Sequence, residues 1–125
     1  MSKPAVTPMI HVPDVAATAE WYRALGFEVT GTAHDGVEMT WAQLTLGATQ
    51  VMLNCGGRPA EHDRRDVDLY VLTDDVEAFR RRLDGRIELI EDLHDTFYGM
   101  REFIIRDPNG FWITFGQRIS DGDTE

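Results

Sequence analysis

The segment YGMREFIIRDPNGFWITFGQ, residues 98–117, places side chains that can bind a small molecule on one face of a predicted hairpin. Its DPNG sequence is typical of a tight turn, because proline presets φ and the last glycine accepts a left-handed conformation. The flanking strands then alternate their faces, and one face carries Glu102, Ile104, Trp112 and Thr114. A carboxylate beside an indole predicts recognition of an aromatic or cationic group.

The opposite face of the same hairpin is strongly apolar and predicts a core. The register set by the turn pairs Phe103 with Phe115 and Ile105 with Ile113. Two readings of the mixed face stay open. It binds a ligand, or it is scaffold in which Glu102 pairs with a neighbouring arginine.

Histidines, serines and the cysteine do not form a familiar catalytic signature. His11 ends the first predicted strand and either lines a site or is solvated. His62 lies in the charged segment AEHDRRD, which favours a hydrated surface, and His94 has aspartates near it in sequence without any guarantee of converging geometry. No nucleophile motif is present, and the segment CGGRPAEH lacks the Lys-Ser/Thr ending of a phosphate loop.

Composition narrows the class of partner. The 125 residues carry a formal charge of −10, which repels nucleic acid and anionic membranes and favours cationic ligands. The alternative, and the default, is that the acidic residues only keep the surface soluble. A single cysteine excludes an internal disulfide framework and favours a reducing compartment. We found no leader-like start and no apolar run of about 18 residues, so we expect a cytoplasmic protein with no nucleic acid or membrane partner.

The order of predicted elements repeats once along the chain. A short strand, a helix with apolar Val15, Ala19, Tyr22 and Leu25, and three strands are followed by the same series after a polar linker. The predicted helices run from Pro13 to Gly26 and from Asp74 to Leu83, and the predicted strands cover 5–12, 27–32, 37–47, 49–55, 67–73, 86–92 and the two arms of the hairpin. We predict one α+β domain over residues 1–125, with βαβββ modules at about 4–55 and 67–118 and a linker at 56–66.

The segments HVPDVAATAEWYRALGFEV and YGMREFIIRDPNGFWITFG resemble the vicinal oxygen chelate superfamily. This superfamily includes glyoxalase I, extradiol dioxygenases, fosfomycin-resistance enzymes and bleomycin-resistance proteins. The resemblance covers nearly the whole chain. It implies that the tandem modules form a curved mixed sheet around a cleft and that the protein is a homodimer.

The resemblance also assigns the four positions at which enzymes of the superfamily hold a divalent metal. Here they are Thr7, Met52, Asp68 and Thr114, of which only Asp68 is a good ligand for a hard cation. We therefore expect no metal, no cofactor and no catalytic residue. The alternative is a metal-dependent lyase or dioxygenase-like enzyme that uses Asp68, Glu102 and His11. A further alternative is a closed cleft with a structural or regulatory role.

Size, acidity and the weak metal positions make the chain similar to the bleomycin-resistance-like branch. Members of that branch sequester a basic, partly planar antibiotic and place an aromatic residue just before a Gly-Arg-Glu-Phe stretch. Phe97 and Tyr98 occupy that neighbourhood, although the inserted Met100 could displace them. The implied function is binding of a small aromatic or cationic ligand. The expected binding residues are Met9, His11, Trp41, Met52, Asp68, Tyr70, Tyr98, Glu102, Trp112 and Thr114.

Overall fold

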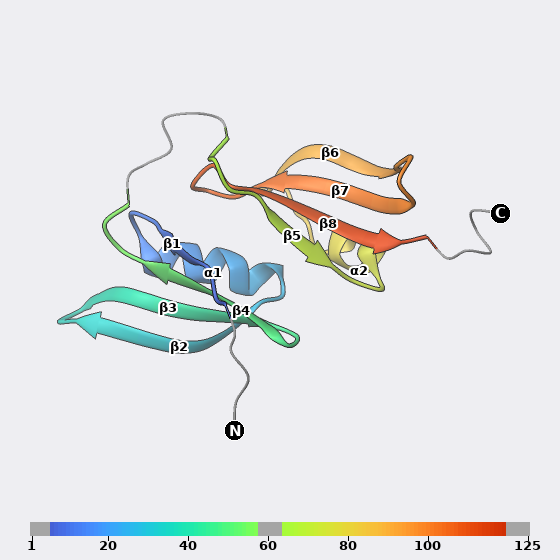
Figure 1. Ribbon diagram of the computed structural model, residues 1–125. Helices are drawn as coiled ribbons and strands as arrows, with labels where there is room; N and C mark the ends of the chain where they lie inside the picture. Colours follow the sequence, from blue (N-terminus) through green and yellow to red (C-terminus); the bar gives the residue numbers. More distant parts are fainter. Residues whose placement is uncertain (1–5, 58–63, 120–125) are drawn as a thin grey trace, which may run out of the picture. The chain divides into compact units, whose positions relative to one another are not determined.

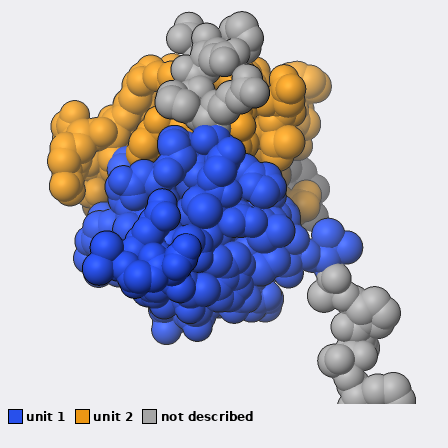
Figure 2. Space-filling view, turned by 90° about the vertical axis from the view of Figure 1, so that its left-hand side faces the viewer, with its two compact units in different colours: residues 1–59 blue, residues 60–125 orange. Residues whose placement is uncertain are grey.

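A computed structural model describes residues 6–57 and 64–119 of the chain. The chain divides into two compact units, residues 1–59 and 60–125 (Figure 2). Their described parts are called module one and module two below. Each contains a four-stranded mixed sheet and a helix in the order βαβββ, which confirms the predicted α+β class and tandem modules. The predicted linker includes residues 58–63, which lie outside the described residues.

Module one forms a sheet with the strand order β1-β4-β3-β2 (Figure 1). Its elements are β1 (Met9–His11), α1 (Val15–Leu25), β2 (Glu28–Asp35), β3 (Glu38–Leu46) and β4 (Thr49–Asn54). Strand β1 runs parallel to β4, and the other pairs are antiparallel. Alternate residues of β3 and β4, including Leu44 and Leu53, are buried and form the core side of the sheet.

Helix α1 has the limits that its sequence predicts. The Asp14 carboxylate caps it by accepting a hydrogen bond from the Ala17 amide at 2.9 Å. Gly26, with φ of 122°, ends it in a conformation that other residues rarely adopt. The predicted apolar stripe is buried at every position, and it includes Tyr22, whose ring meets Phe27 edge-on at 5.2 Å.

Module two repeats the arrangement with the strand order β5-β8-β7-β6. Its elements are β5 (Leu69–Leu72), α2 (Val76–Arg81), β6 (Glu88–Asp95), β7 (Met100–Arg106) and β8 (Trp112–Arg118). Helix α2 is shorter than the predicted segment 74–83. Asp75 caps its start, and the amides of Arg82 and Leu83 bond three residues back, as in a tightened final turn.

The β7–β8 hairpin has the predicted register. Phe103 pairs with Phe115 and Ile105 with Ile113, and all four side chains are fully buried. The two phenyl rings stack with centroids 4.8 Å apart. In the turn, the buried Asp107 carboxylate accepts hydrogen bonds from the amides of Asn109 and Phe111, each at 2.8 Å. This closure fixes which residues face the opposite side of the sheet.

Strand β6 starts and ends later than the predicted segment 86–92. Its pairing with β7 shifts register twice, between Leu89 and Glu91 and between Glu91 and His94. Such irregularities break the alternation on which the sequence prediction depends. None of the helices in the described ranges is long and apolar enough to span a membrane.

Candidate functional site

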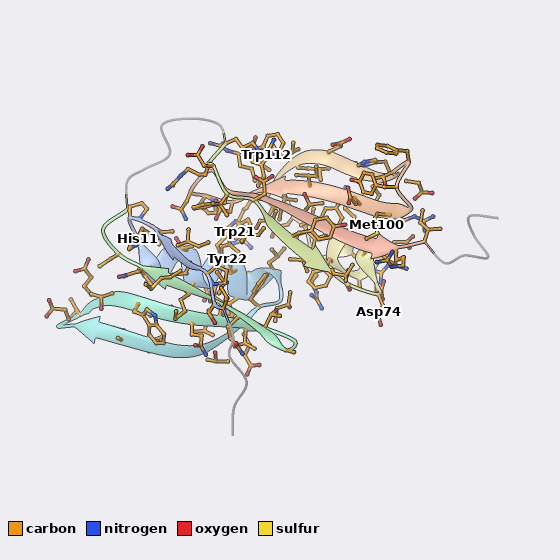
Figure 3. All side chains as sticks on the ribbon, viewed as in Figure 1. His11, Trp21, Tyr22, Asp74, Met100 and Trp112 are labelled. Carbon is orange, nitrogen blue, oxygen red and sulfur yellow. The ribbon has the colours of Figure 1, made fainter. Side chains whose placement is uncertain are left out.

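The polar face of module two is the side of its sheet opposite the Phe103–Phe115 core. Residues that alternate with the core residues form it, and the register aligns them across three strands. The polar face comprises Tyr70 on β5, Glu102 and Ile104 on β7, and Trp112, Thr114 and Gly116 on β8. Trp112 and Met100 mark opposite ends of the hairpin that carries most of it (Figure 3).

Glu102 is the chemical centre of this face. It is only 3% exposed, yet both of its carboxylate oxygens accept a hydrogen bond from a tyrosine. The Tyr70 hydroxyl donates to Oε2 at 2.7 Å, and the Tyr98 hydroxyl donates to Oε1 at 2.7 Å. Tyr70 and Tyr98 are 51% and 56% exposed, so a buried acid accepts hydrogen bonds from two half-exposed tyrosines. We call these three residues the Tyr–Glu–Tyr cluster.

Gly116 makes the first of these hydrogen bonds possible. Tyr70 lies on β5, while Glu102 lies two strands away on β7, with β8 between them. Gly116 pairs with Glu102 in register, and a Cβ atom there would stand 2.0 Å from the Tyr70 hydroxyl oxygen. The missing side chain therefore leaves the space across which the phenol reaches the carboxylate.

Tyr98 reaches the same carboxylate from the β6–β7 turn. Two features shape this turn. Gly99 has a φ of 83°, and the Thr96 amide donates a hydrogen bond to the Met100 carbonyl at 2.7 Å. The fully exposed Phe97 ring packs edge-on against Tyr98 at 5.1 Å. With Met100 inserted in the segment, Tyr98 still contacts Glu102.

Both phenols of the cluster hold their protons firmly. Burial, followed by the hydrogen bond to Glu102, raises the pKa of Tyr70 well above its ordinary value, while Arg118 opposes this shift. The hydrogen bond to Glu102 is the largest cause that raises the pKa of Tyr98. An ionised phenol beside the carboxylate would lose the bond and add like charge, so both hydroxyls remain donors at neutral pH.

Trp112 and Asp68 meet through an arginine that our sequence analysis did not single out. The Arg64 guanidinium carbon lies 4.2 Å from the centroid of the Trp112 ring. Arg64 also donates to Asp68, through Nε at 3.2 Å and through a second, closer contact. Asp68, expected as the counter-charge of a ligand, therefore already has a cation beside it.

The expected residues of module one lie on the corresponding side of its sheet. Met9 pairs with Met52 in register, while His11 and Trp41 both pair with Asn54. The Asn54 amide nitrogen is 3.9 Å from the Met9 sulfur. These side chains are exposed or half-buried and carry thioether, indole, imidazole and amide groups, without a carboxylate among them.

The structure thus brings together some of the ten predicted residues. Tyr70, Tyr98 and Glu102 form one hydrogen-bonded cluster, and Thr114 is the register partner of Tyr70. Sequence reasoning missed Gly116 and Arg64. A glycine inside a strand signals a close approach, whereas the irregular segment around Arg64 carries no comparable signal.

The residues at the superfamily's metal positions do not fit a hard divalent cation. Thr7, Met52 and Thr114 offer two hydroxyls and a thioether, and Asp68 is bound to Arg64. The alternative set relies on Asp68 and Glu102, whose oxygens already have partners. Across residues 6–57 and 64–119, no group of three or more His, Cys, Asp or Glu side chains is arranged to hold a metal ion.

His94 lies on β6 beside the Tyr–Glu–Tyr cluster, because it is the register partner of Glu102. Its imidazole lies 3.5 Å from a Glu91 oxygen, and its other nitrogen contacts the Asp92 carbonyl at 3.0 Å. His62 lies outside the described residues.

Comparison with known proteins gives concordant matches over most of the chain. The Glyoxalase/Bleomycin resistance protein/Dioxygenase superfamily matches residues 6–115. An uncharacterized protein of Mycobacterium bovis is 28% identical over 132 residues, which cover 95% of this chain and 86% of that protein. TioX from Micromonospora sp. ML1 is 20% identical with a TM-score of 0.73, covering 92% of this chain and 100% of that one. The bleomycin-binding protein complexed with bleomycin is 18% identical with a TM-score of 0.70, covering 93% and 99%.

Proposed function

The chain belongs to the Glyoxalase/Bleomycin resistance protein/Dioxygenase superfamily, and we propose that it is a metal-free protein that binds and sequesters a small aromatic or cationic natural product, such as an antibiotic. One observation carries this proposal: Glu102 is buried, yet two exposed phenols are held over it on a face that also contains an indole. The binding surface is the polar face of module two.

A purely structural role explains this face poorly. A carboxylate removed from water is costly unless hydrogen bonds compensate it, and an apolar residue at position 102 would satisfy the sheet more simply. Here two tyrosines and a side-chain-free position at Gly116 are committed to keeping that acid in place. A buried acid on a strand departs from the usual pattern of apolar buried residues, and such departures occur mainly at functional sites.

The chemistry of the face suits the proposed ligand class. Aromatic rings at Tyr70 and Tyr98 offer flat surfaces on which a planar group stacks, and the face also contains the Trp112 indole, over which the Arg64 guanidinium lies. Glu102 supplies negative charge, and the formal charge of −10 attracts cations to the protein as a whole. The similar fold of a protein that binds bleomycin supports a ligand of this kind.

We also propose that the protein acts as a homodimer in the cytoplasm. Each sheet ends in edge strands, and pairing with a second copy is one way to cover such edges. Sedimentation at micromolar concentration tests this arrangement, and a sample that remains wholly monomeric would contradict it.

A thermal-shift panel on protein treated with EDTA tests the binding function. The panel contains bleomycin and three matched compounds: 2-naphthylmethylamine, 2-naphthylmethanol and 2-naphthoate. Binding to the folded state raises the melting temperature, and we expect the cations to raise it more than the alcohol, and the alcohol more than the acid. Absence of any shift would refute the proposal. A shift that requires an added divalent metal would favour the metal-dependent enzyme instead.

A further inference from the structure

Building on the proposed binding function, we infer that the Tyr–Glu–Tyr cluster is a hydrogen-bond-acceptor site for a nitrogen cation that carries at least two N–H bonds. Guanidinium, amidinium and primary ammonium groups belong to this class. Quaternary ammonium ions and anions do not. The inference depends on where the two hydroxyl hydrogens of the cluster are placed.

Both hydroxyl hydrogens of the cluster take part in hydrogen bonds within it. Each phenol has a single O–H, and both point to Glu102, one to each carboxylate oxygen at 2.7 Å. A carboxylate has no hydrogen to donate. The cluster therefore offers a ligand lone pairs only. The raised pKa values of Tyr70 and Tyr98 support this arrangement, because both hydroxyls stay protonated at neutral pH.

Access to the cluster is through the phenols. Glu102 is 3% exposed, whereas Tyr70 and Tyr98 are each more than half exposed. A ligand therefore meets the two tyrosines before it meets the carboxylate. Donation to the carboxylate polarises each phenol and makes its oxygen a better acceptor. Two such oxygens favour a group that donates two hydrogen bonds.

Several arginines of module two have acids other than Glu102 as partners. Arg64 pairs with Asp68, Arg80 with Asp92, Arg101 with Asp95, and Arg106 with Glu88. Arg118 acts on the Tyr70 phenol, while Glu91 and a hydrogen bond with the Thr96 side chain act on the Tyr98 phenol. On β6, His94 is the register partner of Glu102.

A site that offers only lone pairs beside a negative charge disfavours two classes of ion. A quaternary ammonium has no N–H and keeps only the attraction of charge to the ring faces. A carboxylate or phosphate meets lone pairs and a like charge. The site thus selects by donor count as well as by charge.

The test compares two probes with the same ring and charge: 2-naphthylmethylamine and its N,N,N-trimethyl derivative. Calorimetry measures their dissociation constants with the full chain. We expect the primary ammonium to bind about tenfold more tightly, the scale of a hydrogen bond to a charged group. Equal binding, or tighter binding of the quaternary ion, overturns the inference while leaving the proposed binding function intact. This arm needs no variant.

Glu102→Gln provides the second arm. Its amide can donate to one phenol, which frees that hydroxyl to donate outward, so the site loses its charge and its acceptor-only character. We expect weaker binding of the primary ammonium, a smaller gap to the quaternary ion and less discrimination against 2-naphthoate. The control Glu28→Gln removes the same charge from module one and should leave all three constants unchanged.

Each remaining outcome is decisive. Unchanged selectivity in folded Glu102→Gln places the cation elsewhere and overturns the inference. If bleomycin and every naphthyl probe fail to bind the wild-type chain, the proposed function fails as well.

Discussion

The two modules share one architecture but present different chemistry on corresponding faces. Module one shows Met9, Met52 and Trp41 around the Asn54 amide, and module two shows a buried acid under two phenols. Both use a strand glycine to let an aromatic ring lie close to the sheet. A Cβ atom at Gly31 would come within 3.1 Å of the Trp41 ring, and one at Gly116 within 2.0 Å of the Tyr70 hydroxyl.

The shared βαβββ order therefore determines which residues lie on the face opposite the core, while the types of those residues differ between the two modules. Thioether and indole groups adapt to the shape of an apolar ligand. A carboxylate with fixed donors recognises charge and hydrogen-bond pattern instead. We therefore expect the face of module two, the proposed binding surface, to distinguish cations from anions, and the face of module one to lack this discrimination.

The largest expected effect concerns the cores, in which the modules should be alike. Phe103→Ala removes a fully buried ring from module two and should lower the free energy of unfolding by about 3–5 kcal/mol. Leu53→Ala removes a comparably buried side chain from module one and should cost about 2–5 kcal/mol. Urea denaturation measures both.

A matched surface variant separates packing from face chemistry. Met9→Ala shortens a side chain that is 47% exposed on module one and should leave the free energy of unfolding nearly unchanged. A cost for Met9→Ala as large as that for Leu53→Ala would show that this face is part of a core rather than a binding surface.

A smaller effect is expected from Gly116→Ala, which alters the polar face of module two without touching its core. The new methyl group would occupy the position of the Tyr70 hydroxyl, so the ring must turn away and Glu102 loses one donor. We expect a loss of about 1 kcal/mol in urea denaturation, the net value of a hydrogen bond.

A double-mutant cycle with Tyr70→Phe checks this cause. If the methyl group acts only by displacing the hydroxyl, the double variant should be about as stable as the less stable single variant. Fully additive losses would mean that Gly116→Ala damages the sheet itself.

The local parts of the fold could be predicted from sequence. The limits of α1 follow from Asp14 and Gly26, and the DPNG turn sets the pairing of Phe103 with Phe115. The alternation of side chains along β7 then places Glu102 on the face opposite the core. These features depend on neighbours within a few residues or on one tight turn, so sequence patterns contain them.

The rest depends on contacts between distant segments. The end of β6 was missed because two register shifts, between Leu89 and His94, interrupt its alternation. The hydrogen bond between Tyr70 and Glu102 spans three strands, and only the assembled sheet brings them together. Arg64 was read as part of a charged linker, since nothing in that segment indicates that its guanidinium covers Trp112.

The two phenols of module two should respond to pH in a way that depends on Glu102. Burial and then the hydrogen bond to Glu102 raise the pKa of Tyr70, and the hydrogen bond to Glu102 is the largest cause that raises the pKa of Tyr98. The stabilising contribution of the two protonated phenols is therefore complete below the unfolded pKa of about 10. It is lost as pH rises through the folded pKa values. Ultraviolet titration of tyrosinate should show both phenols ionising earlier in Glu102→Gln. Unchanged titration would mean that Glu102 does not control them.

The smallest expected effect concerns Asp68, the second acid on this side of module two. Its side chain is 37% exposed and already paired with Arg64, so solvent screens it and a neighbouring cation offsets its charge. Asp68→Asn should leave the urea midpoint nearly unchanged. It should weaken binding of 2-naphthylmethylamine by about threefold or less, well below the loss in Glu102→Gln.

Arg64→Gln supplies the complementary measurement. It leaves Asp68 without its cation and removes the guanidinium from the Trp112 ring, so both become available to a cationic probe. Binding of 2-naphthylmethylamine should therefore tighten slightly rather than weaken. If Asp68→Asn instead abolishes binding while Glu102→Gln is silent, the cation is held by Asp68 and Trp112, and the difference between the modules lies at the start of β5 rather than at the Tyr–Glu–Tyr cluster.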